Sequence, residues 1–242
     1  EMWVRRAGAT PPPGRYAACV AASGWCPAES RRDIDKDVPR TFGLGGMNLR
    51  ELEPHLRRVL MAYAVADPET AYCQGMGFVA GAALLPFVTE SQPPSAADEE
   101  RAFAWLGFMV NGPLAGCYSS GMAGLAAHQQ ALRELLQRRR PALVAHLDDL
   151  GCPIECFTAP LLLKGFQQLP LPLALEAMDL LAARRVSALQ LVLAVCEHAA
   201  PAMTRAKDAI DVQNALAQAC DMRMRLRTLV DAHVGGRERC MR

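Results

Sequence analysis

The sequence predicts an all-α protein, and three observations lead to that fold class. Apolar residues recur at intervals of three and four along most of the 242 residues, few stretches alternate as strands do, and Leu, Ala, Arg and Gln dominate. With helices of ordinary length, about 11 residues, the chain is expected to contain roughly a dozen of them. No internal repeat is evident, which argues against a solenoid. We therefore expect one multi-helix domain over residues 1–242, either undivided or built of two packed lobes.

The first third of the chain is the least regular. The run Pro11–Gly14 is a cluster of helix breakers. A short helix is expected over residues 28–36, ended by Pro39, because proline lacks an amide hydrogen and pushes the preceding residue out of helical geometry. The glycines at 43, 45 and 46 predict a flexible loop after it.

Two helices are expected next, on either side of Asp67-Pro68. Pro54 fits the first turn of one helix, where its missing N–H costs nothing. Its predicted buried stripe consists of Leu56, Val59, Leu60 and Tyr63. The second helix is expected over residues 71–87, apolar nearly all round and therefore in the core.

The rest of the chain also reads as helices separated by breakers. A Pro/Ser loop at 91–97 precedes a helix at 98–109 with Phe103, Leu106 and Met109 inward. A helix is expected at 125–139, with Leu125, Leu132, Leu135 and Leu136 inward. The next helix begins at Pro141 and is closed by a left-handed Gly151, and a later one at 188–198 is capped by Ser187. The tail at 222–227 is expected to fray.

Bulk composition excludes several classes of function. The 26 basic and 25 acidic residues nearly cancel, so net charge gives no case for binding nucleic acid or an anionic membrane. The 9 cysteines are odd in number, form no CxxC pair, and follow no secretory signal, which favours reduced thiols and a cytoplasmic location. The longest apolar stretches fall short of the ~20 residues that a membrane span needs.

Metal and phosphate sites are not supported. Asp33, Asp35 and Asp37 alternate as in a calcium loop, but the glycine and glutamate that such a loop requires later are absent. The glycines at 43–46 have no GK[ST] and no preceding strand. Zinc spacing is missing among the five isolated histidines, His55, His128, His146, His198 and His233.

Nucleophilic chemistry is not supported either. Cys73 has no nearby base in the sequence, so a small buried thiol is the better interpretation. The run Arg138–Arg140 is expected to stabilise a helix C-terminus, with contact to a lipid or an acidic partner as the alternative. No residue set predicts chemistry on a substrate of the chain's own.

Two short stretches stand apart from ordinary helix sequence. Residues 34–42 read Ile-Asp-Lys-Asp-Val-Pro-Arg-Thr-Phe, an I-x-x-D-x-x-R pattern, and residues 72–76 read Tyr-Cys-Gln-Gly-Met. In this order and at this separation they resemble the arginine-finger and glutamine-finger motifs of the TBC domain, the all-helical module of Rab GTPase-activating proteins. Similarity also covers 56–64, 67–69, 141–151 and 157–166, so the resemblance extends over about 11–200, with further C-terminal helices at 201–242.

The resemblance implies that Arg40 and Gln74 are the catalytic residues, supplied in trans to a GTP-bound Rab-type GTPase. An arginine delivered in trans stabilises charge on the transferring phosphoryl group and is worth roughly 10³–10⁵ in rate. A side-chain amide both donates and accepts, so Gln74 can position the attacking water in place of the GTPase's own glutamine. No cofactor or metal of the chain's own is implied, because GTP and Mg²⁺ arrive with the partner.

Neighbouring residues are expected to support the two fingers. Pro39 is expected to hold Arg40 off the helix, on a turn that projects, and Asp37 is expected to hold the Arg40 guanidinium in a productive rotamer. Thr41 is a candidate for a local hydrogen bond.

The glutamine segment has supporting residues of its own. Tyr72 and Gly75 are expected to set the backbone around Gln74, with Gly75 allowing close approach of another chain.

The match departs from the family pattern in places. Gly77 stands where the family usually has asparagine, and residues 160–162 and 177–179 lack the usual tryptophans. Two alternatives to a GTPase activator remain: a helical module that binds a GTPase or another effector without catalysis, and a plain helical scaffold. Membrane association is expected only indirectly, at endomembranes through the GTPase partner.

Overall fold

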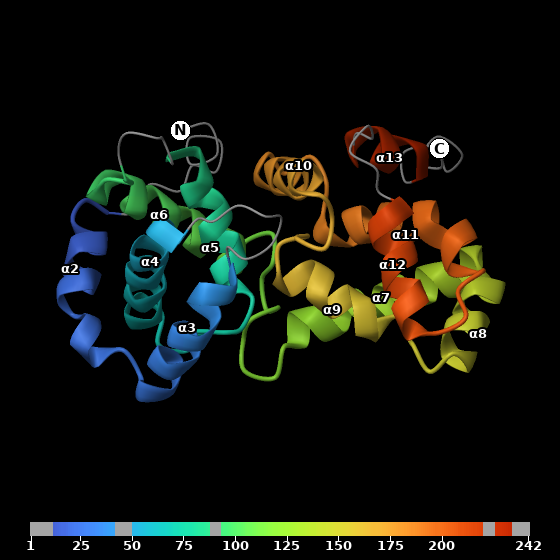
Figure 1. The fold of residues 1–242 in the computed structure, drawn as a ribbon, viewed down its shortest axis with the longest axis horizontal. Helices are drawn as coiled ribbons and strands as arrows, with labels where there is room; N and C mark the ends of the chain where they lie inside the picture. The colour runs from blue at the N-terminus through green and yellow to red at the C-terminus, as the bar shows by residue number, and fades with distance from the viewer. Residues whose placement is uncertain (1–11, 42–49, 88–92, 220–225, 234–242) are drawn as a thin grey trace. The chain divides into compact units, whose positions relative to one another are not determined.

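The computed structural model describes residues 12–41, 50–87, 93–219 and 226–233, and in these ranges the chain is helical with no strand (Figure 1). The α-helices are α2 (Arg15–Ala21), α3 (Ala28–Thr41), α4 (Glu53–Ala66), α5 (Met76–Leu84), α6 (Ala96–Asn111), α7 (Ala123–Arg139), α8 (Pro141–Asp149), α9 (Glu155–Leu163), α10 (Leu171–Ala182), α11 (Ala188–Met203), α12 (Ala209–Ala219) and α13 (Leu226–His233). Three short 3₁₀ turns are η1 (Ser23–Trp25), η2 (Arg50–Leu52) and η3 (Leu85–Phe87). The all-α prediction is confirmed.

The chain divides into two compact units, residues 1–122 and 123–242. In the first unit α4 is central, and α2, α3, α5 and α6 all pack on it. Pro54 lies in the first turn of α4, and its predicted stripe is buried, with Leu56 and Val59 fully enclosed. Because α3 and α5 contact each other as well as α4, the elements that carry the two motifs share one core.

In the second unit, the apolar helix α11 is central. It packs against α7, α9, α12 and α13, and most of its side chains are buried. Ser187 is the N-cap of this helix, as the sequence predicted, and it forms a capping box with Gln190. The helix continues past residue 198 to Met203. Gly151 follows α8 with a φ of 63°, the expected left-handed cap.

Other boundaries differ modestly from the expectations. Helix α6 is two residues longer at each end than 98–109, and its N-cap residue, Ser95, forms a capping box with Asp98. Leu135, expected to face inward from α7, is only half-buried. Pro11, the glycines at 43–46 and most of the 222–227 tail lie outside the described residues. In the described ranges no helix is both long and apolar enough to cross a membrane.

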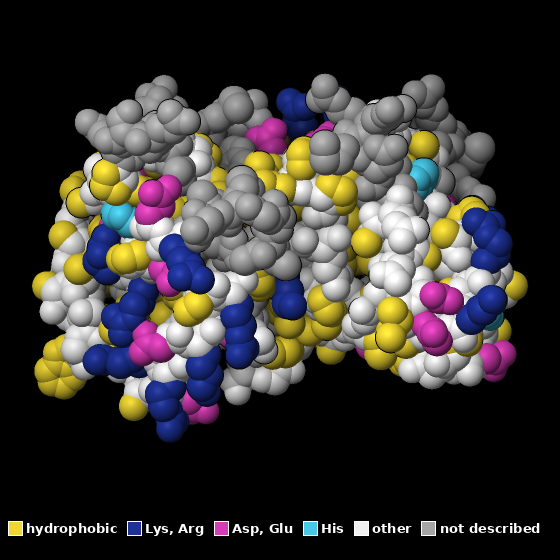
Figure 2. Space-filling model, viewed as in Figure 1, with side chains coloured by type: hydrophobic (Ala, Val, Ile, Leu, Met, Phe, Trp, Pro, Cys, Tyr) yellow, Lys and Arg dark blue, Asp and Glu magenta, His cyan; other side chains and the backbone are white. Residues whose placement is uncertain are grey.

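The first unit carries a concentration of basic side chains on the face in view. Figure 2 shows Lys and Arg side chains gathered over α3 and α4, with fewer acidic side chains between them. The net charge of the whole chain, +1, conceals this local concentration.

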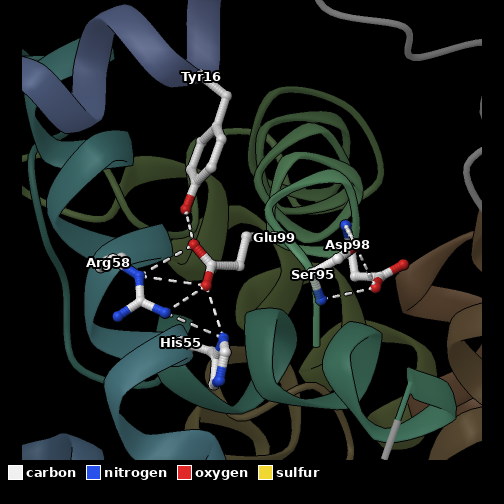
Figure 3. Close-up of polar contacts among 6 residues, drawn as sticks. All are labelled: Tyr16, His55, Arg58, Ser95, Asp98 and Glu99. Atoms are coloured by element: carbon white, nitrogen blue, oxygen red, sulfur yellow. Dashed lines mark hydrogen bonds and ion pairs between the residues drawn. The ribbon is translucent and has the colours of Figure 1, made fainter. Parts of the chain in front are cut away.

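A buried carboxylate ties three helices of the first unit together (Figure 3). Glu99 of α6 is 4% exposed and accepts hydrogen bonds from the Tyr16 hydroxyl of α2 and from Arg58 of α4. His55 Nδ1, also on α4, lies 2.6 Å from Glu99 Oε1. Burial alone raises the pKa of Glu99, but the hydrogen bonds from Arg58, Tyr16 and His55 outweigh burial and lower it.

Glu99→Gln is expected to lower the free energy of unfolding by about 2 kcal/mol at pH 7, because bonds to a charged acceptor are replaced by weaker ones. The folded-state pKa of Glu99 is lowered, so this stabilisation is present above the unfolded value near 4.5 and is lost as pH falls through the folded value. Urea unfolding at pH 7 and pH 3 measures both effects. The neighbouring half-exposed Glu100→Gln is the control, and an equal loss in both variants contradicts the account.

Candidate functional site

Arg40 lies in the last turn of α3, with its side chain exposed. The expectation that this helix stops at residue 36 and that Pro39 holds Arg40 off it is wrong, because α3 continues through Pro39 to Thr41. Proline removes only one intrahelical hydrogen bond, and tertiary burial of Ile34, Val38 and Thr41 along one face keeps the helix in place. Arg40 is therefore exposed at the end of a helix whose opposite face is packed on the core.

A turn organised by Asp67 connects α4 to the glutamine motif. The Asp67 carboxylate accepts hydrogen bonds from the Tyr63 hydroxyl at 2.9 Å and from the Thr70 amide at 3.2 Å. The Ala71 amide donates to the Asp67 carbonyl at 2.7 Å, and Ala71 has a φ of 51°, in the left-handed region. These contacts turn the chain so that residues 72–75 return toward α3.

Gln74 lies in a loop rather than in a helix. The expected helix over 71–87 instead begins at Met76, and η3 follows α5 at its other end. Gly75 has a φ of 107°, which other residues adopt at a cost, and it is the N-cap residue immediately before α5. Met76 is fully buried and fixes the start of α5, while Gln74, two residues earlier, is exposed.

A hydrogen bond between side chains 35 residues apart joins the two motifs. The Tyr72 hydroxyl donates to Asp37 Oδ2 at 2.8 Å. Burial, and then the hydrogen bond to Asp37, raise the pKa of Tyr72 well above its ordinary value, so the phenol stays protonated as the donor. The bond connects the last turn but one of α3 to the residue two positions before Gln74.

A close backbone approach joins the same two segments. A Cβ atom at Gly77, in the first turn of α5, would lie only 2.9 Å from the Thr41 hydroxyl oxygen. The Thr41 hydroxyl in turn donates to the Asp37 carbonyl at 3.0 Å, the local hydrogen bond expected for this residue. The glycine, which stands where the family pattern usually has asparagine, thus allows α5 to lie close against the end of α3.

Asp37 does not perform the role expected from the sequence. Both Asp37 and Arg40 are described, and no ion pair or hydrogen bond joins them. The carboxylate instead accepts a hydrogen bond from the half-buried, neutral Tyr72 hydroxyl. Arg40 is thus left exposed on the same unit as Gln74, while Asp37 fixes the relative position of their segments.

The other acidic residues of α3 have partners too. Asp35 pairs with Arg57 at 2.6 Å, and Asp33 pairs with Lys36 at 3.1 Å. The three alternating aspartates therefore point to different partners, and the described residues contain no cluster of three metal-ligating side chains. Burial, followed by the negative charge of Asp37, raises the pKa of Cys73, so its half-buried thiol is not activated as a nucleophile.

Sequence reasoning missed Asp67 and Gly77 as structural parts of the site. Asp67-Pro68 after a helix is a turn signal, since an aspartate side chain accepts from backbone amides two or three residues on. From the sequence alone, this signal indicates the end of α4 but not the partners of the Asp67 carboxylate. The contact between Gly77 and Thr41 has no local signal, because it depends on packing between residues 36 positions apart in the chain.

Comparisons with known proteins agree with this architecture. Residues 23–203 match the Rab-GTPase-TBC domain family, which is well over half of the chain. Growth hormone-regulated TBC protein 1 of Rattus norvegicus is 34% identical over 119 residues, covering 48% of this chain and 38% of that protein. Rab GTPase-activating protein eat-17 of Caenorhabditis elegans is 33% identical over 156 residues, covering 60% of this chain and 16% of that protein. The chain thus matches well under half the length of either relative.

Solved structures give the same fold. The Chlamydomonas flagellar RabGAP TBC domain superposes with a TM-score of 0.74 at 21% identity, over 96% of this chain and 77% of that one. The Ypt/Rab-GAP domain of Gyp1p superposes with a TM-score of 0.73 at 13% identity, over 95% of this chain and 79% of that one. Together with the match over residues 23–203, these findings establish that the chain belongs to the Rab-GTPase-TBC domain family.

Proposed function

We propose that this chain accelerates GTP hydrolysis by a Rab-type small GTPase in its GTP-bound state, by supplying Arg40 and Gln74 to the partner's nucleotide site. The observation that carries the proposal is the Tyr72–Asp37 hydrogen bond, which ties the two motifs together while leaving both finger side chains exposed. GTP and Mg²⁺ belong to the partner in this proposal. The chain then acts in the cytoplasm and takes part in vesicle trafficking. It reaches membranes through the GTPase.

Arg40 supplies charge in this proposal. The transferring phosphoryl group carries negative charge spread over its oxygens, and a guanidinium remains protonated at any physiological pH. An arginine held at the end of a packed helix needs little reorganisation to meet that charge, and exclusion of water by the docked partner strengthens the interaction. Burial of Val38 and Thr41 on either side of Arg40 supports this rigidity.

Gln74 positions the attacking water in this proposal. Its amide oxygen can accept a hydrogen bond from the attacking water, and its NH₂ group can donate to a phosphoryl oxygen, which aligns the water for in-line attack. Holding a reactant in this way depends on a fixed backbone. The left-handed Gly75, the buried Met76 and the Tyr72–Asp37 bond all support such a backbone at Gln74.

A single-turnover hydrolysis assay over a panel of GTP-loaded Rab-type GTPases tests the proposal. The expected result is that catalytic amounts of the chain accelerate hydrolysis by at least one member more than 100-fold. Binding to GTP-loaded GTPases without acceleration of any of them would favour a non-catalytic binding module. A chain that neither binds nor accelerates any member contradicts both functions.

Tyr72→Phe is expected to lower the stimulated hydrolysis rate about tenfold and the free energy of unfolding by about 1 kcal/mol. The substitution removes one hydrogen bond and leaves the Asp37 carboxylate without its donor, so the two finger segments are no longer held in register. Single-turnover kinetics and urea unfolding measure the two effects. Tyr63→Phe, which removes the bond to Asp67 on the other side of the same turn, is the matched control for stability. Unchanged kinetics in Tyr72→Phe would show that the bond does not position the fingers.

A further inference from the structure

The outer face of α3 carries a row of three basic side chains, of which the two-finger mechanism uses only Arg40. Arg32, Lys36 and Arg40 are four residues apart and all exposed, so they line one face of the helix. The opposite face, with Ile34 and Val38, is buried on the core. Between Arg32 and Arg40 the row extends about 12 Å along the helix, at 1.5 Å per residue. We call Arg32, Lys36 and Arg40 the basic ridge.

The acidic residues of α3 lie beside the ridge rather than on it. Asp35 is held by Arg57 of α4 on one side, and Asp37 is held by Tyr72 on the other. Asp33 pairs with Lys36, but the two side chains are 48% and 65% exposed, and an exposed pair of this kind contributes little and exchanges readily with another partner. Glu29 lies in the first turn of α3, at the opposite end from Arg40.

The surroundings extend the positive charge beyond α3. Figure 2 shows Lys and Arg side chains gathered over both helices. On α4, Arg58 is exposed but its guanidinium is paired with Glu99. Surface charges act over roughly one Debye length, about 8 Å at physiological ionic strength. Lys36, about 6 Å along the helix from Arg40, therefore acts on whatever lies against Arg40. Arg32, about 12 Å from Arg40, acts on the part of the same partner that lies against Lys36. A partner that brings its nucleotide to Arg40 must therefore lie against a positively charged surface.

We propose that the basic ridge selects and orients the partner by docking an acidic surface next to the nucleotide site of the GTPase. This inference rests on the proposed GTPase-activating function and narrows it to GTPases that are acidic at that place. Arg32 and Lys36 determine specificity here, and neither takes part in the hydrolysis step. Charge complementarity of this kind raises association rates and excludes partners of the wrong sign.

The test uses Arg32→Glu/Lys36→Glu with the most responsive GTPase of the panel. The expected result is a KM for the GTPase that is raised about tenfold, with kcat unchanged. The variant associates with the GTPase more weakly, but it retains Arg40 and Gln74. Between 50 and 300 mM salt, the wild-type kcat/KM should fall and that of the variant should stay nearly flat. Arg32→Gln/Lys36→Gln, which removes charge without reversing it, should give an intermediate KM.

Arg138→Glu/Arg140→Glu is the matched control, with the same change in net charge at exposed positions of the second unit. Its KM should equal that of the wild type. If the wild type is active and the ridge variant has the same KM for the GTPase, the docking role alone is overturned. A ridge variant that loses only binding to phosphatidylserine vesicles overturns the docking role in the same way. A wild type that neither binds nor stimulates any GTPase overturns this inference together with the proposed function.

Discussion

Replacing Arg40 by alanine is expected to reduce the stimulated rate of GTP hydrolysis by about 10³-fold. The guanidinium is the only group proposed to supply positive charge to the transferring phosphoryl group from this side of the complex. The Arg40 side chain is exposed and makes no ion pair with Asp37, so its removal should leave the unfolding free energy within about 0.5 kcal/mol of wild type. Single-turnover kinetics at saturating chain concentration measure the effect.

Arg40→Lys is the informative control for this prediction. Lysine keeps the charge but not the planar fork that binds two phosphoryl oxygens together, so most of the rate should remain lost. Arg32→Ala, eight residues earlier on the same exposed face, removes equal charge and should leave kcat unchanged. A full rate in Arg40→Ala would remove the arginine finger from the mechanism.

Replacing Gln74 by alanine is expected to reduce the stimulated rate about 100-fold, the second largest effect. One side-chain amide that positions a water and donates to a developing charge lowers the activation free energy of an enzyme by a few kcal/mol. That energy corresponds to a factor of about 100 in rate. Because Gln74 is exposed in a loop fixed by Gly75 and Met76, the fold should not change. The measurement is again single-turnover hydrolysis, together with thermal unfolding.

The source of the water-positioning amide can be isolated with a GTPase whose own catalytic glutamine has been replaced by alanine. Wild-type chain should still accelerate hydrolysis by this GTPase, whereas Gln74→Ala should not. Gln74→Glu keeps the shape but loses the donor, so it should be nearly as slow as alanine. If the altered GTPase no longer responds to wild-type chain, the water is positioned by the GTPase and Gln74 has another role.

Much of the fold could be predicted because local signals and burial agree. In α4, Pro54 in the first turn and a stripe at helical spacing lead to the same element, and the stripe is buried. In α11, Ser187 and the apolar residues that follow it also agree, and the capping box forms. Where propensity, capping and hydrophobic period are consistent, a sequence is informative about its own structure.

The errors concentrate at the candidate site, where long-range contacts override local rules. Proline was expected to end α3, but burial of Val38 and Thr41 carries the helix past it. An apolar run was expected to continue a helix back to residue 71, but Ala71 and Gly75 both adopt positive φ. The physical reason in each case is a tertiary contact that local sequence does not encode.

The candidate site itself was predicted in part. The motif resemblance gave Arg40 and Gln74, and both are exposed on the first unit. It did not give the partner of Asp37, because only the folded chain brings Tyr72 within 2.8 Å of that carboxylate. Nor could it give the contact between Gly77 and Thr41, which requires two helices to be placed in three dimensions.

Binding to a GDP-loaded Rab-type GTPase with aluminium fluoride, which mimics the transferring phosphoryl group, tests most directly whether both fingers reach one nucleotide. A residue that acts in the transition state should contribute to this complex far more than to the complex with GTP alone. We expect wild-type chain to bind at least 100-fold more tightly when aluminium fluoride is present, and Arg40→Ala and Gln74→Ala each to lose most of that gain. Equal affinity with and without aluminium fluoride, in a wild-type chain that binds the GTPase, would contradict the account.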